Sequence, residues 1–369
     1  MLTDKEKFKV QNRTNVLGVG VSALDMDEAV ELLLDARKKD RSGYICVTGV
    51  HGVIESQRDP ELKAIHNRSF LTVPDGMPTV WMGREQGFVH MGRVYGPDLM
   101  LNIFEKTSAL NQRKEDRGWK SEDRGQRTDV SDHKSGVISD LGSPTSDKKH
   151  LTHFLYGATE ETLRKLKTNL EARFPGVQIV GTYAPPFRPL NDAEEEELRK
   201  LVAECKPDFF WVGLSTPKQE RFMYAHSASL KIEGLGPRTE VGRRTQSEAG
   251  ATRRQQSGNS EDGGQRTEVK GQRAKVSGQQ SGSDLRPPTS DCCKFPLDAG
   301  IMLGVGAAFP IHAGLQKDSP EWIKNSGLQW LHRLCQEPRR LWRRYLYIVP
   351  TFLWLAAIQL LGIKKYDTE

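Results

Sequence analysis

The sequence predicts an α/β fold built on a largely parallel sheet. Short apolar runs alternate along the chain with segments in which apolar residues recur at helical spacing. Most of the apolar runs are followed by small or hydroxyl-bearing residues, as expected where a buried strand turns into a helix. Strands that alternate with helices need crossover connections, and such connections place neighbouring strands parallel.

The elements follow in a regular order. Apolar runs typical of strands occupy residues 16–21, 44–48, 70–73, 153–156, 177–180, 209–212 and 301–305. Helices are expected at residues 26–37, 51–58, 159–174 and 192–204, and from residues 78 and 217 onward. The helix at 192–204 has acidic residues in its first turn, where they complement the helix dipole.

Two polar stretches, residues 111–149 and 231–294, interrupt this pattern. They resemble each other, since SEDRGQRTDV and SDLGSPTSD in the first match SEDGGQRTEV and SDLRPPTSD in the second. Such segments bury too little apolar surface to offset the entropy of ordering, so we expect two disordered polar inserts. Binding of nucleic acid by their arginines is the functional alternative. The remaining chain divides into an α/β domain over residues 1–337 and an appendage over residues 338–369.

Charge and cysteine content limit the function classes. The net charge of +6 is compatible with phosphate or anionic lipid and does not require nucleic acid. Five cysteines are scattered without a CxxC pair, which favours free thiols in a reducing compartment. The first ten residues, MLTDKEKFKV, lack the apolar segment of a secretory signal, so we expect a cytoplasmic protein.

The carboxyl ends of the predicted strands carry the candidate site. Parallel sheets bind ligands beyond these ends, and helix N-termini there favour phosphate. Thr48, Asp75, Gln219, Gly304 and Gly306 all follow or end apolar runs. They predict a site for a phosphorylated ligand. No His, Cys or Asp cluster has metal-ligand spacing, GxSxG is absent, and neither GxG has the third glycine of a dinucleotide fingerprint.

Two of these residues have structural alternatives. Asp75 lies between Pro74 and Gly76 and could act as a general base or merely shape an Asp-Gly turn. Gln219 follows Thr216 by three residues, the spacing of a capping box, so it could cap a helix, contact a ligand, or do both.

The C-terminal segment combines a basic cluster with an apolar run. Arg339, Arg340, Arg343 and Arg344 follow Pro338, and the apolar run over residues 345–363 comes next. This pattern favours a helix that lies at a membrane surface or packs on the core, with a spanning helix as the rival.

Several stretches resemble the WecG/TagA/CpsF glycosyltransferases. They read TGVHGVIESQRDPELKAIHNRSFLTVPDGMPTVW, GRVYGPDLM, VGLSTPKQERF, LGVGAAFPIHAG and GLQWLHRLCQEPRRLWRRYL, in the family's order. The resemblance implies a Rossmann-like fold of the GT-E type. It also implies inverting, metal-independent transfer, without a cofactor, of an N-acetylmannosamine-like sugar from a UDP-sugar. The implied acceptor is an undecaprenyl-diphosphate-linked sugar used for exopolysaccharide, capsule or teichoic acid.

The resemblance also implies roles for individual residues. Asp75 matches the catalytic base, Thr48 a pocket threonine, and Arg93 an arginine near the diphosphate. Gln219 matches a ligand contact of the TPKQE motif. The substrate-binding set also includes Gly304 and Gly306, and the resemblance adds Arg339, Arg340 and Arg343 as arginines that close over the phosphates.

The sequence departs from the family at Val50, where many relatives have asparagine, and at Ser215 and Phe222, where glycine and tryptophan are common. These departures put the identity of the donor in doubt. We expect a peripheral protein on the inner face of the plasma membrane, with no nucleic-acid partner and with a homo-oligomer left open. The alternative function is a non-catalytic nucleotide-sugar binding protein of the same fold.

Overall fold

The structure, a computed structural model, describes residues 12–122, 150–227 and 296–368. All of them belong to one compact unit made of Met1–Leu230 and Asp291–Glu369. Most of each predicted polar insert lies outside the described residues. The expected disorder of the inserts therefore stays a prediction.

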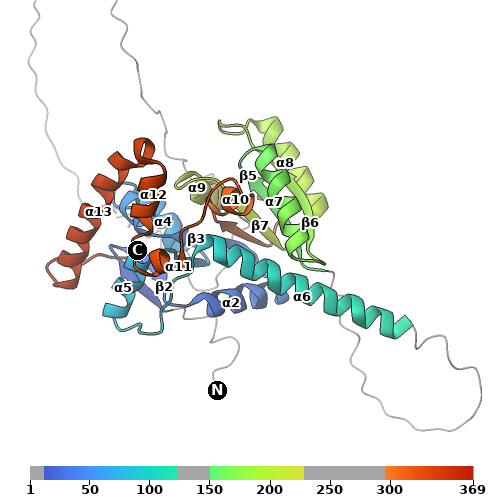
Figure 1. Cartoon of the computed structure of the whole chain (residues 1–369), viewed down its shortest axis with the longest axis horizontal. Coiled ribbons are helices and arrows are strands. Elements are labelled where there is room, and N and C mark those ends of the chain that lie inside the picture. Colours follow the sequence, from blue (N-terminus) through green and yellow to red (C-terminus); the bar gives the residue numbers. More distant parts are fainter. Residues whose placement is uncertain (1–11, 123–149, 228–295, 369) are drawn as a thin grey trace, which may run out of the picture. The chain divides into compact units, whose positions relative to one another are not determined.

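A six-stranded parallel sheet confirms the predicted fold class (Figure 1). Its strands are β3 (Gly43–Thr48), β4 (Leu71–Pro74), β5 (Thr152–Gly157), β6 (Gln178–Tyr183), β7 (Phe209–Gly213) and β8 (Ile301–Gly304). They are hydrogen-bonded in the order β4-β3-β8-β7-β5-β6, and every neighbouring pair is parallel. All six carboxyl ends therefore lie at one edge of the sheet.

Helices connect the strands and extend the chain beyond them. In the first half they are α2 (Met26–Lys38), α3 (Val50–Glu55), α4 (Pro60–Arg68), α5 (Met77–Glu85) and α6 (Gly96–Glu122). The later ones are α7 (Glu160–Arg173), α8 (Asp192–Cys205), α9 (Lys218–His226), α10 (Ala308–His312), α11 (Glu321–Asn325), α12 (Gln329–Gln336) and α13 (Pro338–Leu360). Capping boxes formed by Asp25 with Glu28 and by Asn191 with Glu194 explain where α2 and α8 begin.

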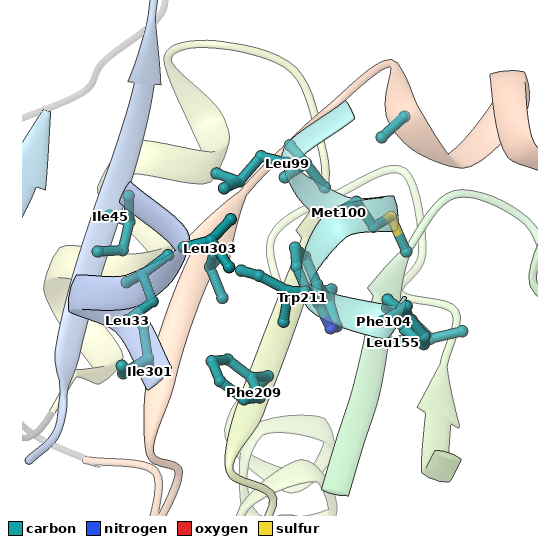
Figure 2. Packing of buried hydrophobic residues seen from close by; sticks show 14 of the residues in the cluster. Leu33, Ile45, Leu99, Met100, Phe104, Leu155, Phe209, Trp211, Ile301 and Leu303 are labelled. Atoms are coloured by element: carbon teal, nitrogen blue, oxygen red, sulfur yellow. The ribbon is translucent and has the colours of Figure 1, made fainter. Parts of the chain in front are cut away.

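The two faces of the sheet bury two separate apolar clusters, because successive side chains of a strand point to opposite faces. On β7, Phe209 and Trp211 pack with α2, α6, α7 and α10, whereas Phe210 and Val212 pack with α4, α8 and α9. Figure 2 shows the first cluster, in which Trp211 lies among residues of the sheet and α6. Burial on both faces explains why the strands read as continuous apolar runs.

The first apolar run forms a hairpin instead of a strand of the main sheet. β1 (Arg13–Val16) and β2 (Val19–Ser22) pair antiparallel in a sheet of their own. Leu17 and Gly18 turn the chain with φ of 54° and 82°, which ends the extended run. Apolar composition alone could not reveal this turn.

The fold also changes the start of the first predicted insert. Helix α6 continues through Glu122, past the expected boundary at residue 111. Asn111 is fully buried, and its amide donates to the backbone oxygens of Leu151 and Gly176 at 3.1 and 3.2 Å. Asn111 thus connects α6 to the segment before β5. In the sequence, this residue could not be distinguished from the polar stretch that follows it.

Helix α13 begins at Pro338, where the appendage was expected, and docks on the hairpin. Leu341, Ile348, Phe352 and Ala356 are buried, and the last three belong to the apolar cluster of β1, β2, α3 and α5. The Gln359 side chain accepts from the Leu17 N–H at 2.9 Å. One face of α13 is therefore core-docked. Within the described ranges, no helix has the length and apolarity needed to cross a membrane.

Candidate active site

Residues predicted for the site meet at the carboxyl edge of the sheet. Thr48 and Pro74 end adjacent strands in register, and Gly304 ends the strand on the other side of β3. The Asp75 N–H donates to the Thr48 oxygen at 3.1 Å, and the Val94 N–H donates to the Pro74 oxygen at 2.8 Å. The parallel register thus brings Asp75 and the segment that carries Arg93 together beside Thr48.

The Asp75 side chain follows β4 at this edge and is partly buried. Its Oδ1 accepts from the Gly96 N–H at 3.1 Å, whereas Oδ2 has no hydrogen-bond donor among the described residues. The hydrogen bond links the end of β4 to the start of α6 and does not close a local Asp-Gly turn. Burial raises the pKa of Asp75, although the Gly96 N–H, Arg333 and Arg93 act in the opposite direction.

Arg93 approaches the same edge and is nearly buried. Its side chain is 9% exposed, and Nη2 lies 3.7 Å from Oδ2 of Asp98. The guanidinium lies 5.0 Å from the ring centroid of Tyr95. Nη1 is buried without a hydrogen-bond acceptor among the described residues, so this arginine keeps a donor for a ligand.

Gln219 is in the site, but not as part of a capping box. The Thr216 hydroxyl donates to Oε1 of Glu220 at 2.9 Å and does not accept from the Gln219 N–H. The Gln219 N–H donates to the Ser215 oxygen at 3.2 Å. Because a backbone carbonyl takes that N–H, the capping interpretation of Thr216 and Gln219 is wrong.

Gly304 and Gly306 let the chain pass close to Gln219. A Cβ at Gly304 would lie 2.7 Å from Cε of Met223 and 3.1 Å from Cδ of Gln219. Gly306 has a φ of +45°, and a Cβ there would lie 2.9 Å from the Leu214 oxygen. A side chain at Gly306 would press on the backbone of the loop before α9, and one at Gly304 would require the Met223 and Gln219 side chains of α9 to move.

The C-terminal arginines are placed differently from each other. Arg339 and Arg343 are exposed, and neither makes an ion pair with the other predicted site residues in the described structure. The side chain of Arg340 lies outside the described residues. Arg344 hydrogen-bonds to the His51 ring, just beyond Thr48. Burial, followed by the charge of Arg344, lowers the pKa of His51 to about 3.

Arg333 is the site residue that sequence reasoning missed. It lies on α12, its charge acts on Asp75, and its side chain hydrogen-bonds to Tyr345. The neighbouring Tyr95, Asp75 and Tyr345 raise its pKa against the effect of burial. In the sequence Arg333 lies before the C-terminal arginine cluster. Its spacing from other residues does not distinguish it from an arginine that is merely exposed to solvent.

A buried lysine holds α11 and α12 in place. Lys324 is 5% exposed, and its Nζ lies 2.7 Å from Asp318, 3.2 Å from Glu321 and 3.5 Å from Asp98. The Tyr95 hydroxyl donates to Oδ1 of Asp318 at 3.0 Å. Because Asp98 and Tyr95 belong to the segment around the start of α6, this network holds α11 against that segment. The Ser319 hydroxyl lies 2.9 Å from Nδ1 of His332 and links the same region to α12, the helix that carries Arg333.

Four of the eight unpaired buried side-chain atoms in the described part of the chain lie at this edge. Thr48 Oγ1, Arg93 Nη1, Gln219 Oε1 and Glu220 Oε2 are buried with no hydrogen-bond partner among the described residues. Leaving such atoms unpaired costs about 1–3 kcal/mol each, so structures retain them where a ligand supplies the partner. The charges of Arg333 and Arg93 act on the Asp75 carboxyl group at the same edge, and guanidinium groups are well suited to binding phosphate.

The fold places the chain among the open parallel α/β proteins, a class in which ligands bind beyond the carboxyl ends of the strands. The family model of the "Glycosyl transferase WecG/TagA/CpsF family" matches residues 14–114, 137–254 and 293–366. The chain belongs to this family. The two gaps in the match fall within the polar inserts.

Curated relatives share one printed name, N-acetylglucosaminyldiphosphoundecaprenol N-acetyl-beta-D-mannosaminyltransferase. One, from Staphylococcus aureus strain MW2, is 20% identical over 58% of this chain and 57% of its own length. Another, from strain NCTC 8325 of the same species, is 31% identical over 25% of this chain and 37% of its own length. A relative from Bacillus spizizenii is 18% identical over 84% of this chain and 77% of its own length. The chain thus spans little more than half of the first of these proteins.

Proposed function

We propose that this chain is a glycosyltransferase that moves an N-acetylmannosamine-like sugar from a UDP-sugar to an undecaprenyl-diphosphate-linked acceptor for a cell-surface polysaccharide. Membership of the family and the names of the relatives support the reaction and the acceptor. The observation that carries the proposal is Asp75, a carboxylate of raised pKa with one unbound oxygen beside Arg93 and Arg333.

Asp75 is the general base in this proposal. Its Oδ2 takes the proton from the acceptor hydroxyl as that oxygen attacks the anomeric carbon of the donor sugar. The bond between the anomeric carbon and the diphosphate breaks on the opposite face, so the configuration inverts. The Gly96 N–H holds Oδ1 and orients the carboxylate for the transfer. Burial favours the protonated form, which makes this carboxylate a stronger base than one in water.

Arg93 and Arg333 bind the diphosphate that leaves. A guanidinium fork binds phosphate oxygens through two parallel hydrogen bonds, and its charge offsets the charge that develops on the leaving group. In this proposal the two arginines do the work that a metal ion does in other nucleotide-sugar enzymes. Thr48, Gln219 and the Gly304–Gly306 turn line the donor pocket, and Arg339, Arg340 and Arg343 remain proposed phosphate ligands for a state in which α13 is closer to the substrate.

The test is a transfer assay with the full chain. Each of several UDP-sugars is incubated with a polyprenyl-diphosphate-linked N-acetylglucosamine, and the product is identified by mass. We expect a mass gain of one N-acetylhexosamine from UDP-N-acetylmannosamine, a change of anomeric configuration by NMR, and full activity with EDTA. Binding of UDP-sugars without any product would instead support the non-catalytic alternative.

A membrane-facing surface on α13 fits the lipid-linked acceptor. The face opposite the docked one exposes large apolar side chains, namely Trp342, Leu346, Leu353, Trp354 and Leu360. Arg339, Arg343 and Arg344 are exposed at the start of the same helix. Apolar and aromatic side chains next to basic ones are typical of helices that lie in the interface of an anionic membrane. The proposed location is therefore the inner face of the plasma membrane.

Acidic side chains introduced on this apolar surface should release the protein from vesicles. Leu353 and Trp354 are 63% and 68% exposed, and we expect Leu353→Glu with Trp354→Glu to weaken binding to phosphatidylglycerol vesicles about tenfold or more. Co-sedimentation measures the effect. Phe187→Glu is the matched control, because Phe187 is 93% exposed and lies outside α13. Equal vesicle binding by the double variant and the wild type would contradict this placement.

A further inference from the structure

Two neighbouring buried residues on α9 lie behind the donor pocket, and only one of them has a proposed role. Gln219 is 4% exposed and Glu220 is 1% exposed. Oε1 of Glu220 accepts two hydrogen bonds, from the Thr216 hydroxyl at 2.9 Å and from Nε2 of Gln219 at 3.0 Å. Both of these donors are side-chain groups, and the carboxyl group also interacts with the Glu220 backbone N–H in the first turn of α9.

The contacts of Gln219 determine which way its amide points. Nε2 also donates to the Gly304 oxygen at 3.3 Å. A backbone carbonyl can only accept, so the amino group of Gln219 must face Gly304 and Glu220. The carbonyl oxygen Oε1 therefore points the other way, toward Gly306, where a built Cβ would lie 3.3 Å from it.

That carbonyl oxygen is buried and has no hydrogen-bond partner in the described part of the chain. An acceptor left without a donor at the mouth of a pocket is best explained by a ligand that brings the donor. Gln219 could recognise either an acceptor or a donor if its amide were free to turn. Held by Glu220 and Gly304, it can recognise only a donor.

We propose that Glu220 is a positioning residue that holds the Gln219 amide so that Oε1 accepts a hydrogen bond from the bound nucleotide. The ligand group is an N–H or O–H donor, supplied by the imide N–H of a uracil or by a ribose hydroxyl. This inference rests on the proposed function, since it takes the ligand to be a uridine nucleotide. It explains why a carboxyl group is buried where no cation of the described residues pairs with it.

A double-mutant cycle read by UDP binding tests the proposal. In calorimetric titrations of the full chain, we expect Glu220→Leu to weaken UDP binding about tenfold, the size of one well-placed hydrogen bond. Glu220→Gln should bind UDP as the wild type does, because its amide oxygen still accepts from Thr216 and Gln219. In a Gln219→Met background, Glu220→Leu should cause no further loss, since the residue it positions is gone.

Nucleotide analogues identify the donor group. 3-Methyl-UDP lacks the imide N–H and 2′-deoxy-UDP lacks one ribose hydroxyl. For the analogue that lacks the recognised donor, the wild type and Glu220→Leu should bind equally, whereas the other analogue should keep the tenfold difference. Thermal unfolding checks that each variant is folded, and Glu220→Met replaces Glu220→Leu if the latter is not.

Three results would overturn the proposal. Unchanged UDP affinity in folded Glu220→Leu would remove the role of Glu220. A loss in Glu220→Gln as large as that in Glu220→Leu would show that the accepted hydrogen bonds are not what matters. Additive losses in the Gln219→Met background would indicate a general packing effect. Absence of UDP binding by the wild type would instead reject the proposed function, and the Glu220 assignment with it.

Discussion

Replacing Asp75 with asparagine should lower the transfer rate about 10²- to 10⁴-fold, the usual contribution of a general base. Asparagine keeps the shape of the side chain and can still accept from the Gly96 N–H, which lies 3.1 Å from Oδ1. It cannot take a proton from the acceptor hydroxyl. The measurement is kcat with saturating donor and acceptor, alongside UDP affinity, which should change little.

The pH dependence of kcat should also identify Asp75 as the general base. Burial raises the pKa of Asp75 above its ordinary value of 3.8, so the base form is lost at a higher pH than for an exposed aspartate. The acid limb of the kcat profile should therefore lie above pH 3.8 in the wild type and disappear from the residual activity of Asp75→Asn.

The stability of Asp75→Asn should not fall. A carboxyl group whose pKa is raised in the folded state binds its proton more tightly there than in the unfolded chain. In its ionised form the group imposes the cost of a buried charge on the fold, and this cost declines as the pH falls through the raised pKa toward the ordinary value. The neutral asparagine removes the cost, so the midpoint of thermal unfolding should stay or rise at pH 7.

Comparable turnover by Asp75→Asn and the wild type would exclude Asp75 as the base. If the wild type also binds UDP-sugars without transferring them, the non-catalytic alternative is the better description. A variant that loses both activity and stability would point to a structural role through the Gly96 hydrogen bond.

Replacing Arg333 with methionine should lower kcat/KM about 10²-fold or more, as expected when one group that stabilises developing charge is removed. Arg333 acts on Asp75 from α12, and its own pKa is raised by Tyr95, Asp75 and Tyr345. Loss of this cation should also push the pKa of Asp75 further up and move the acid limb to higher pH. Arg333→Lys should recover only part of the rate, because lysine keeps the charge but not the two-pronged geometry.

Arg164→Met is the matched control for this prediction, because Arg164 is exposed on α7 and has no proposed contact with the substrate. Arg339→Met and Arg343→Met test the exposed arginines of α13. If Arg339→Met or Arg343→Met lowers kcat as far as Arg333→Met does, the exposed arginines reach the phosphates during the reaction, and the placement of α13 changes on substrate binding.

Much of the fold was predictable because its signals are local. β7 reads as four consecutive apolar residues, and its buried faces follow from strand alternation alone. The positions of Thr48 and Asp75 beside each other follow from two parallel strands in register. The hairpin at Leu17 and Gly18 was missed because the residue pattern of an apolar run does not show which of its residues adopt a positive φ.

The sequence by itself predicted the largely parallel sheet and the edge at which Thr48 and Asp75 meet, because apolar periodicity and the alternation of strands and helices are local signals. Only the tertiary structure showed that the charge of Arg333 acts on Asp75 and how Gln219 is held. Lys324 on α11, next to the Arg333 helix, pairs with Asp98 and Asp318, which are distant from each other in the chain. The Gln219 amide is oriented by Gly304, which is 85 residues away. Such contacts depend on packing between distant segments, and no local spacing encodes them.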